Sequence, residues 1–395
     1  MKQWMTAMVL LLVLSFPGIV RAEGSESEKM TDEMLSAYTE FYGDIFADGM
    51  DSLETGEAFL ELLPDKEPKE LLGKLVRGEV EVSLSNILQT LLRLLLKEVY
   101  SSLKVMVLIV ALAVLCSYLT GLQDSFGKEG VGMTAFYVCY IVIAGIASAS
   151  FYQAAECVGG TVEQIALFMK MIVPIVITSL VSCGALVSAS VFEPVLVTIV
   201  ELAVSLIQDL MIPLVMIATG MNIVNNLSDR FKTQKLVKFM NQTIKWGLSI
   251  MLTVFVSVAG LQSIATGGAD ALTVKLSKFA TSNLIPVVGG ILSESVETVM
   301  NCSVLIKNSV GIFGIICLIV LAVLPLLKVA AILIIFRLTA AVCEPVSEPK
   351  IITCLTELAN SISVLFSMLA AVTVMFIIVL TIVINAGNTV MMLGR

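Results

Sequence analysis

Two carboxylates in the middle of an apolar stretch are the residues here with the clearest chemical potential. Asp209 lies near the centre of the apolar segment 195–223, and Glu201 precedes it by about 80° around a helix and about 12 Å along it. A charge at such a depth costs roughly 3 kcal/mol against lipid, so both side chains should face protein or water. The pair is predicted to line a polar path. The alternative is a structural ion pair with a lysine, or an uncharged Asp209.

A lysine occupies another apolar segment. Lys328 lies within 309–337, which as a helix of about 42 Å exceeds the roughly 30 Å hydrocarbon core of a bilayer. Lys328 is therefore expected near one membrane interface, where its amine reaches the headgroups. The alternative is a pairing with Asp209 across the polar path.

Two more carboxylates lie on an interrupted segment. Glu294 and Glu297 are three residues apart and share one face of a helix within 283–305. They are candidate cavity residues, and the alternative is that they belong to a solvated loop. Proline removes a backbone donor and glycine weakens a helix, so breaks are predicted at a set of such positions: Pro174, Pro213, Pro286, Gly289, Gly290 and Pro325.

Several kinds of chemistry are excluded by residue type. The chain has no histidine, which removes His-based acid–base catalysis and His-ligated metal or haem sites. It has eight cysteines in or beside apolar segments, and none forms a C-x-x-C pair, so they are expected to be buried apolar side chains. There is no phosphate-binding loop of the G-x-x-x-x-G-K-[ST] type. We therefore predict no catalytic, cofactor-binding or metal-binding residues, and no enzyme.

The composition is that of a membrane protein. Of 395 residues, 57% are hydrophobic and 14% are charged, with a mean hydropathy of +0.97. Soluble domains are about 25% charged. The formal charge of −8 is concentrated in residues 23–70, where Asp and Glu far outnumber the lysines. This acidic region argues against nucleic acid as a partner.

The amino-terminal region has two predicted parts. Residues 1–22 resemble a secretory signal peptide, with Lys2, a short apolar run and an abrupt change after Ala22; the alternative is an uncleaved anchor. Residues 23–100 then form a small helical region outside the cytoplasm. It ends in an amphipathic helix over 83–100, which lies in the membrane interface or packs against the chain's own helices.

The rest of the chain, 101–395, is predicted to be an all-α, polytopic membrane helix bundle of about six to eight spans, one or two of them re-entrant. Seven apolar segments carry this prediction, and the weaker segment 283–305 is an eighth. The seven are 104–122, 133–155, 166–191, 195–223, 246–266, 309–337 and 361–386.

Two further patterns concern the organisation of these spans. An offset of 112 residues relates Pro174 to Pro286 and Pro213 to Pro325, which predicts an internal repeat of 166–268 and 278–388; chance is the alternative. The basic loop 225–245 favours the cytoplasm, yet four full crossings would place it outside. That conflict disappears if 166–191 is re-entrant.

The later two thirds of the chain resemble one protein family. The resemblance rests on Val187-Ser188-Ala189, on Ser228-Asp229-Arg230-Phe231-Lys232, and on Asn283-Leu284-Ile285-Pro286-Val287-Val288-Gly289, together with shorter pieces that include Lys307-Asn308, Gly311 and Ala386-Gly387-Asn388. These segments are similar to the stage III sporulation protein AE family of endospore-forming bacteria.

The resemblance implies a multi-pass protein of the outer, mother-cell-derived forespore membrane, within a channel or secretion-like complex needed for endospore development. Its implied partners are other stage III sporulation A proteins, including a cytoplasmic ATPase, with stage II sporulation protein Q indirectly, and membrane lipid. Two functions remain open. The chain is a pore or permease-like subunit, or it is a non-transporting platform that holds the ring-forming and ATPase subunits.

Overall fold

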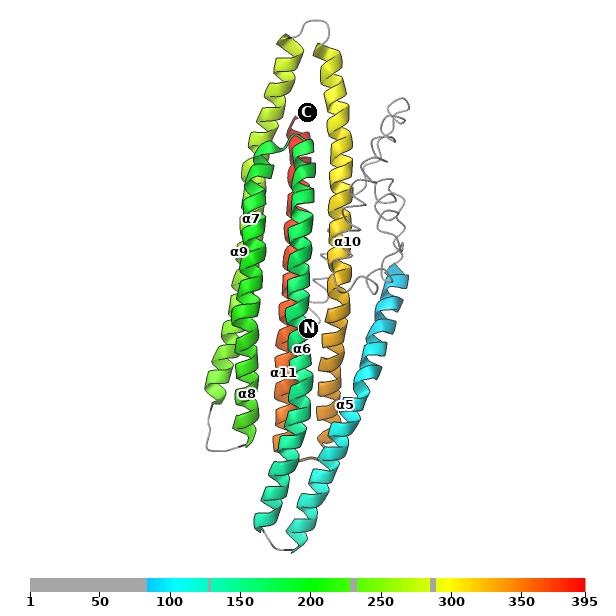
Figure 1. Ribbon diagram of the computed structural model, residues 1–395, viewed down its shortest axis with the longest axis vertical. Helices are drawn as coiled ribbons and strands as arrows, with labels where there is room; N and C mark the ends of the chain where they lie inside the picture. The colour runs from blue at the N-terminus through cyan, green and yellow to red at the C-terminus, as the bar shows by residue number, and fades with distance from the viewer. Residues whose placement is uncertain (1–83, 127–128, 228–232, 285–288, 395) are drawn as a thin grey trace.

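Every element that the structure describes is a helix, which confirms the all-α prediction. The computed structural model describes residues 84–126, 129–227, 233–284 and 289–394. The elements are α5 (Leu84–Phe126), α6 (Glu129–Ser182), α7 (Leu186–Ser205), the π-helix η1 (Leu206–Met211), α8 (Ile212–Leu227), α9 (Gln234–Leu284), α10 (Gly289–Cys343) and α11 (Pro349–Gly394). Figure 1 shows them as an elongated bundle in which the α5–α6 and α9–α10 hairpins project at opposite ends.

Within the described residues, six helical stretches are long and apolar enough to cross a membrane. They lie in α5, in α6, in the continuous run of α7, η1 and α8, and in α9, α10 and α11. This confirms a polytopic helix bundle, at the lower end of the predicted number of spans. The longest helix, α10, has 55 residues and is about 82 Å long, well beyond the roughly 30 Å hydrocarbon core.

The re-entrant reading of 166–191 is wrong. The predicted spans 133–155 and 166–191 belong largely to one helix, α6, which continues through Pro174. Proline removes one backbone hydrogen bond, and a long helix whose buried side is packed both before and after the proline tolerates that loss, with Pro174 itself on the exposed side. Residues around Pro174 are indeed buried on both sides: Ile172 and Val173 precede it, and Ile175 and Val176 follow it.

The break comes ten residues later, at Gly184. Its φ is +80°, a left-handed conformation that glycine adopts without a steric penalty. The Ala185 N–H donates to the Leu180 carbonyl and the Gly184 N–H donates to the Val181 carbonyl, which is the Schellman arrangement that ends many helices. The chain then reverses direction into α7.

The segment 283–305 is not a separate span. Its residues are divided between the end of α9 at Leu284 and the start of α10 at Gly289, and α10 then continues through Pro325 to Cys343. The predicted break at Pro325 is therefore wrong, and Pro286 lies outside the described residues. Gly289 and Gly290 form the first turn of α10, where helix-weakening residues cost least.

Pro213 follows an irregular turn instead of a break. The residues directly before it, Leu206–Met211, form the π-helix η1, and α8 begins at Ile212. A proline ring clashes with the carbonyl four residues earlier in an α-helix, and the wider π turn avoids that contact. The helix axis therefore passes through this point without ending.

The amphipathic segment 83–100 and the first span 104–122 form one helix, α5. The predicted signal peptide 1–22 and the acidic residues 23–83 lie outside the described part of the chain.

The predicted repeat stays a prediction. The offset of 112 relates the α8–α9 boundary to the α10–α11 boundary, whereas it places the Gly184 turn inside α10.

The topological conflict was a consequence of counting α6 twice. Three membrane-length stretches precede the basic residues that begin the connection to α9: α5, α6, and α7 with η1 and α8. An odd number of crossings places this basic loop on the opposite side of a membrane from the start of α5. The positive-inside rule and an extracytoplasmic amino-terminal region are then compatible without any re-entrant segment.

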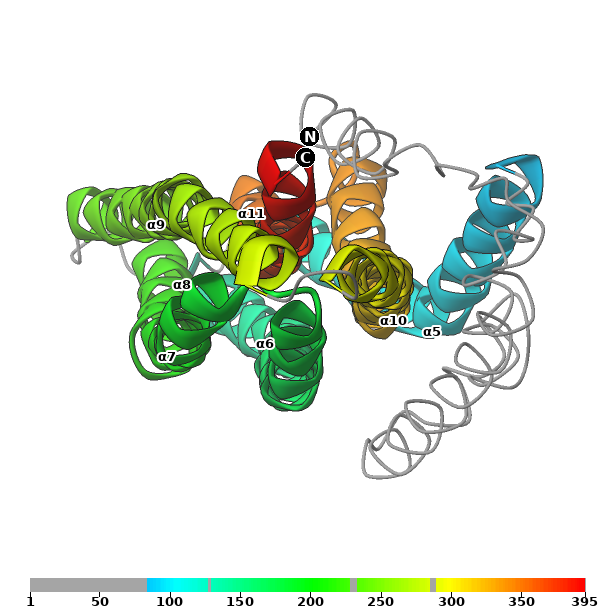
Figure 2. The same cartoon turned by 90° about the horizontal axis from the view of Figure 1, so that it is seen from above.

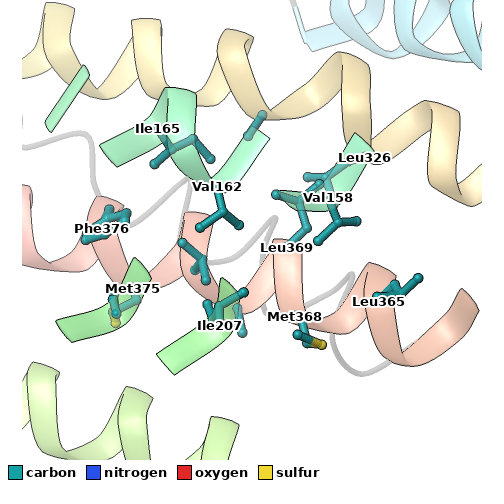
Figure 3. Packing of buried hydrophobic residues seen from close by; sticks show 14 of the residues in the cluster. Val158, Val162, Ile165, Ile207, Leu326, Leu365, Met368, Leu369, Met375 and Phe376 are labelled. Carbon is teal, nitrogen blue, oxygen red and sulfur yellow. The ribbon is translucent and has the colours of Figure 1, made fainter. Parts of the chain in front are cut away.

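The centre of the bundle is filled with apolar side chains. Figure 3 shows Val158, Val162 and Ile165 of α6 on the same side of α11 as Leu369 and Phe376, with Ile207 of η1 and Leu326 of α10 completing the cluster. Seen from the end, the bundle is flattened, with α5 at one edge and α7, α8 and α9 at the other (Figure 2).

Candidate functional site: a charged outward face on α6, α7 and η1

The outward side of α6 is largely polar over the second half of the helix. Exposed positions recur every three or four residues, as expected for one face of a helix. They include Glu156, Gly160, Glu163, Lys170, Thr178 and Ser182. A helix side that faced lipid would carry large apolar residues at such positions, and in this half of α6 only Leu167 and Val181 are of that kind, whereas the first half exposes Val138, Ile141 and Val142.

The neighbouring helix adds carboxylates to this side. Glu193, Glu201 and Asp209 are all exposed on α7 and η1. Glu201 pairs with Lys170 of α6, with 3.4 Å between Oε1 and Nζ. Asp209 accepts a hydrogen bond from the Ser205 hydroxyl at 2.8 Å within its own helix. We refer to Glu156, Glu163, Lys170, Glu193, Glu201 and Asp209 as the charged face.

Contacts between helices fix the depth of the charged face. The Gln208 side-chain amide donates to the Gly159 carbonyl at 3.1 Å, which places Asp209 level with the middle of α6. The stretch formed by α7, η1 and α8 also contacts α9. Gly247 of α9 lies against Met211, and Asp270 of α9 accepts a hydrogen bond from the Val187 N–H. Glu201 and Asp209 therefore lie at the depth of α9 residues 247–270, which include most of the apolar segment 246–266.

At that same depth, α9 presents a lipid-like surface. Its large exposed side chains are apolar, and the exposed polar ones, such as Thr253 and Ser257, are small: the apolar set is Ile250, Val254, Val258, Leu261 and Ile264, the last 80% exposed. At one depth the molecule thus has an apolar side on α9, and a side on α6, α7 and η1 where the charged face lies among exposed apolar residues such as Leu202 and Leu210. A charged side at this depth requires protein or water in front of it.

The predicted polar path lies on the outside of the chain. Glu201 and Asp209 do share one side, as expected, but the space between α6, η1, α10 and α11 is filled by buried apolar residues such as Ile207 (Figure 3). Ile207 points into this core, and Asp209, two residues later, is exposed. A polar passage can therefore run along this chain, between it and whatever faces it.

The other predicted residues are not part of the charged face. Lys328 is exposed on α10, while Asp209 accepts its hydrogen bond from Ser205. Glu294 and Glu297 lie in the first part of α10, and their side chains are outside the described part of the structure.

Asp270 is a buried carboxylate that the sequence analysis missed. It is fully buried, and its two oxygens accept hydrogen bonds from the backbone N–H groups of Val187, at 2.7 Å, and Ser188, at 2.9 Å. These are orphan donors at the start of α7, so Asp270 caps that helix from α9. An acidic residue just beyond the end of an apolar span was the available signal.

Lys307 is a second buried charge that was missed as a site. It is 0% exposed, and its Nζ donates to the Ile384 carbonyl of α11 at 2.7 Å. Asp270 and Lys307 hold α9 to α7 and α10 to α11 near the same end of the bundle. At the other end, Asn222 of α8 donates to Glu357 of α11 at 3.2 Å. These contacts fasten the helices together and are separate from the charged face.

The eight cysteines are all free, and each is buried or half-buried. In the described part of the chain, no three His, Cys, Asp or Glu residues come together as metal ligands. The charged face offers carboxylates along a surface, an arrangement suited to attracting cations and water to it.

Comparisons with known proteins identify the family of this chain. Residues 66–387 match the family described as stage III sporulation protein AE. The stage III sporulation protein AE of Bacillus subtilis (strain 168) is 29% identical over 405 residues, and the alignment covers 99% of each chain. No solved structure matches the chain. The chain is thus a multi-pass membrane protein that belongs to the stage III sporulation protein AE family.

Proposed function

We propose that this chain is a pore or permease-like membrane subunit of the channel complex that connects the mother cell with the forespore during endospore development. The observation that carries the proposal is the charged face, at a depth where α9 exposes only apolar side chains among its large residues. Lipid in front of five carboxylates would cost several kcal/mol, so water or protein must cover them.

The proposal gives the chain a passive chemical role. A polar surface beside a solute path lowers the free energy that a polar solute needs to leave bulk water. Carboxylates on that surface favour cations over anions. We infer that the chain performs no catalysis, since it lacks histidine and a phosphate-binding loop. Energy for directed movement would come from a cytoplasmic ATPase of the complex, one of the other stage III sporulation A proteins.

The proposed orientation follows from the basic residues. Lys235, Lys238 and Lys245 lie near the start of α9, and Arg337 and Lys350 lie near the α10–α11 turn, at the same end of the bundle. Basic residues favour the cytoplasm. The start of α5 and the α9–α10 hairpin then face the space between the two forespore membranes, where stage II sporulation protein Q would be reached indirectly through ring-forming partners.

One observation favours a second function, an assembly platform without transport. In the part of the chain that the structure describes, the centre of the bundle is filled by buried apolar side chains, part of which Figure 3 shows, and this filling leaves no polar route between the described helices. On this view a partner protein, and not water, covers the charged face.

Water access separates the two functions. Single cysteines replace Glu156, Gly160, Glu163 and Thr178 on α6, and Ile250, Val254 and Val258 on α9, in a chain whose native cysteines have been substituted and which still supports sporulation. A small membrane-impermeant thiol reagent is applied to membranes from sporulating cells. The pore predicts labelling along α6 and protection along α9. Protection along both helices would contradict the pore and favour the platform.

A functional test uses Asp209→Asn, which keeps the shape and loses the charge. The pore predicts normal membrane insertion with a sporulation defect after engulfment. Ser190→Ala, an exposed polar residue of α7, is the matched control. Normal spore yield from Asp209→Asn would contradict a working role for this carboxylate.

A further inference from the structure

The two edges of the flattened bundle carry opposite charges. On α5, Arg93, Lys97 and Lys104 are exposed, and with Tyr100, which is 78% exposed, they follow the spacing of one helix face. At the other edge, η1 exposes Asp209. Figure 2 shows α5 and the α7–α8 run at opposite ends of the bundle. In the described part of the chain these side chains have no ion partner, whereas Glu201 is already paired with Lys170.

The opposite charges lie at the same depth. Antiparallel α5 and α6 form a tight hairpin, because α5 ends at Phe126 and α6 begins at Glu129, so residues of the two helices lie level where their numbers add up to about 255. Lys97 is therefore level with residues 157–159 of α6. The bond from Gln208 to the Gly159 carbonyl places Asp209 at that level too. Both charges thus lie midway along α6, and Arg93 is about 6 Å nearer the extracytoplasmic end.

We propose that copies of this chain associate side by side in the membrane, with η1 of one copy against α5 of the next, so that Asp209 faces Arg93 and Lys97 of its neighbour. A second copy of this chain fits each edge, because one chain carries both the basic and the acidic surface at the same depth. The membrane also gives every copy the same orientation, so the two surfaces of neighbouring copies meet. Opposite charges in a low-dielectric setting attract strongly, and each would be costly against lipid.

The contact is head-to-tail, because the two surfaces are different. Such a contact adds copies in one direction and closes into a ring if the rotation between copies permits. Two copies facing each other through the same edge would instead place Asp209 opposite Asp209, which is repulsive. In a head-to-tail array, the neighbour covers Asp209 at the edge of the charged face, and the members of that face on α6 lie on one common side of all copies. The inference does not depend on whether that side conducts.

Cross-linking between edges tests the contact. Leu96 is 58% exposed on α5, and Ser205 is exposed on α7 about one turn from Asp209. Leu96→Cys and Ser205→Cys are combined in the full-length chain whose native cysteines have been substituted. Membranes from sporulating cells are treated with a flexible bis-maleimide. We expect a ladder of dimers, trimers and larger species on a denaturing gel, because the two cysteines of one chain lie at opposite edges.

The single variants are the matched controls, and each should stay monomeric. Lys170→Cys with Glu201→Cys is the reactivity control, since these neighbours should cross-link within one chain. Dimers from Ser205→Cys alone would show a two-fold contact and overturn the proposal. A monomer from the double variant with both thiols reactive would also overturn it, and would leave the edges to the acidic residues 23–83 or to another protein.

Charge exchange gives an independent readout. Adding Asp209→Arg to the double-cysteine chain is expected to reduce the cross-linked fraction about tenfold, equivalent to about 1.4 kcal/mol. Adding Arg93→Asp and Lys97→Asp as well should restore the ladder. An equal ladder with and without Asp209→Arg, or no restoration in a chain that still reaches the membrane, would overturn the pairing. Spore yield and solute passage do not enter this test, so its failure and that of the pore are distinguishable.

Discussion

Asp270 and Ser188, 82 residues apart in the chain, are joined by a hydrogen bond of 2.9 Å from the Ser188 N–H to the Asp270 Oδ2. The Ser188 hydroxyl adds a second link, 2.8 Å from the Thr266 hydroxyl of α9. One turn of α9 thus closes the start of α7, directly after the Gly184 turn. The chain reversal between α6 and α7 is therefore held by a helix that is distant in sequence.

Removing the Asp270 carboxylate is expected to destabilise the bundle. Asp270→Ala leaves two buried N–H groups unpaired and should lower the free energy of unfolding in detergent by about 2 kcal/mol or more. Asp270→Asn keeps one acceptor and should cost less. The eight free cysteines allow unfolding to be followed with a thiol-reactive fluorophore. Thr273→Ala, exposed one turn further along, is the control, and equal stability of Asp270→Ala would contradict the capping role.

Gly184→Ala tests the turn itself. A non-glycine residue at a φ of +80° is strained by about 1–2 kcal/mol, and the new methyl group would also lie 3.0 Å from the Met300 side chain. Gly145→Ala is the matched control variant, because nothing lies within 4 Å of a Cβ at that position and alanine favours a helix. We expect a lower melting temperature for Gly184→Ala and an unchanged or higher one for Gly145→Ala. The reverse order would contradict the turn geometry.

Gly311 permits the close approach of α10 to α11. A Cβ at this position would overlap the Ile384 side chain. Gly311→Ala should therefore cost about 1–3 kcal/mol by overpacking, and Ile384→Ala about 2–5 kcal/mol by loss of packing. Their combination should cost less than the sum, because each change accommodates the other. A strictly additive double variant, measured by the same thermal assay, would show that the helices separate freely at this point.

The two sides of the bundle should tolerate a new carboxylate differently. Val254→Asp on α9 faces lipid and should reduce the membrane-inserted fraction, since an aspartate at the centre of a span costs roughly 3 kcal/mol. Gly160→Asp on α6 adds a carboxylate at a similar depth to a side already polar, and it should insert normally. Alkali extraction of membranes measures both variants. Equal loss of insertion would show that lipid covers both sides.

Topology is testable with one cysteine on each side. Ser52→Cys should react with an impermeant reagent from the space between the membranes, and Gln234→Cys from the cytoplasm only. Three membrane-length stretches separate the start of α5 from Gln234. Labelling of both positions from one side would require an even number of crossings and would contradict the arrangement of helices described above.

Helix content and the membrane class were predictable because they depend on composition and on long apolar runs. The position of the breaks was not. Pro174 and Pro325 were read as breaks, yet both lie inside helices that are packed along most of their length. Gly184 was one small residue among several, and its left-handed role depends on the Schellman hydrogen bonds and on the contact with α9, which connect residues far apart.

The candidate site was predictable in part. The energetic argument from charges in apolar segments identified Glu201 and Asp209, and the structure places both on one side. The same argument could not tell the outside of the bundle from its inside, because Ile207 and Asp209 are only two residues apart and the π turn decides which of them faces the core. Asp270 was missed since its meaning depends on the start of α7, 82 residues away.

The great length of the helices has a mechanical consequence. The α9–α10 hairpin extends beyond one end of the bundle, and the α5–α6 hairpin beyond the other (Figure 1). An uninterrupted helix of 55 residues behaves as a rigid rod, so a sideways push at one tip tilts the whole element. A displacement of the α9–α10 hairpin would therefore be carried along α10 to its turn into α11, at the opposite end of the bundle.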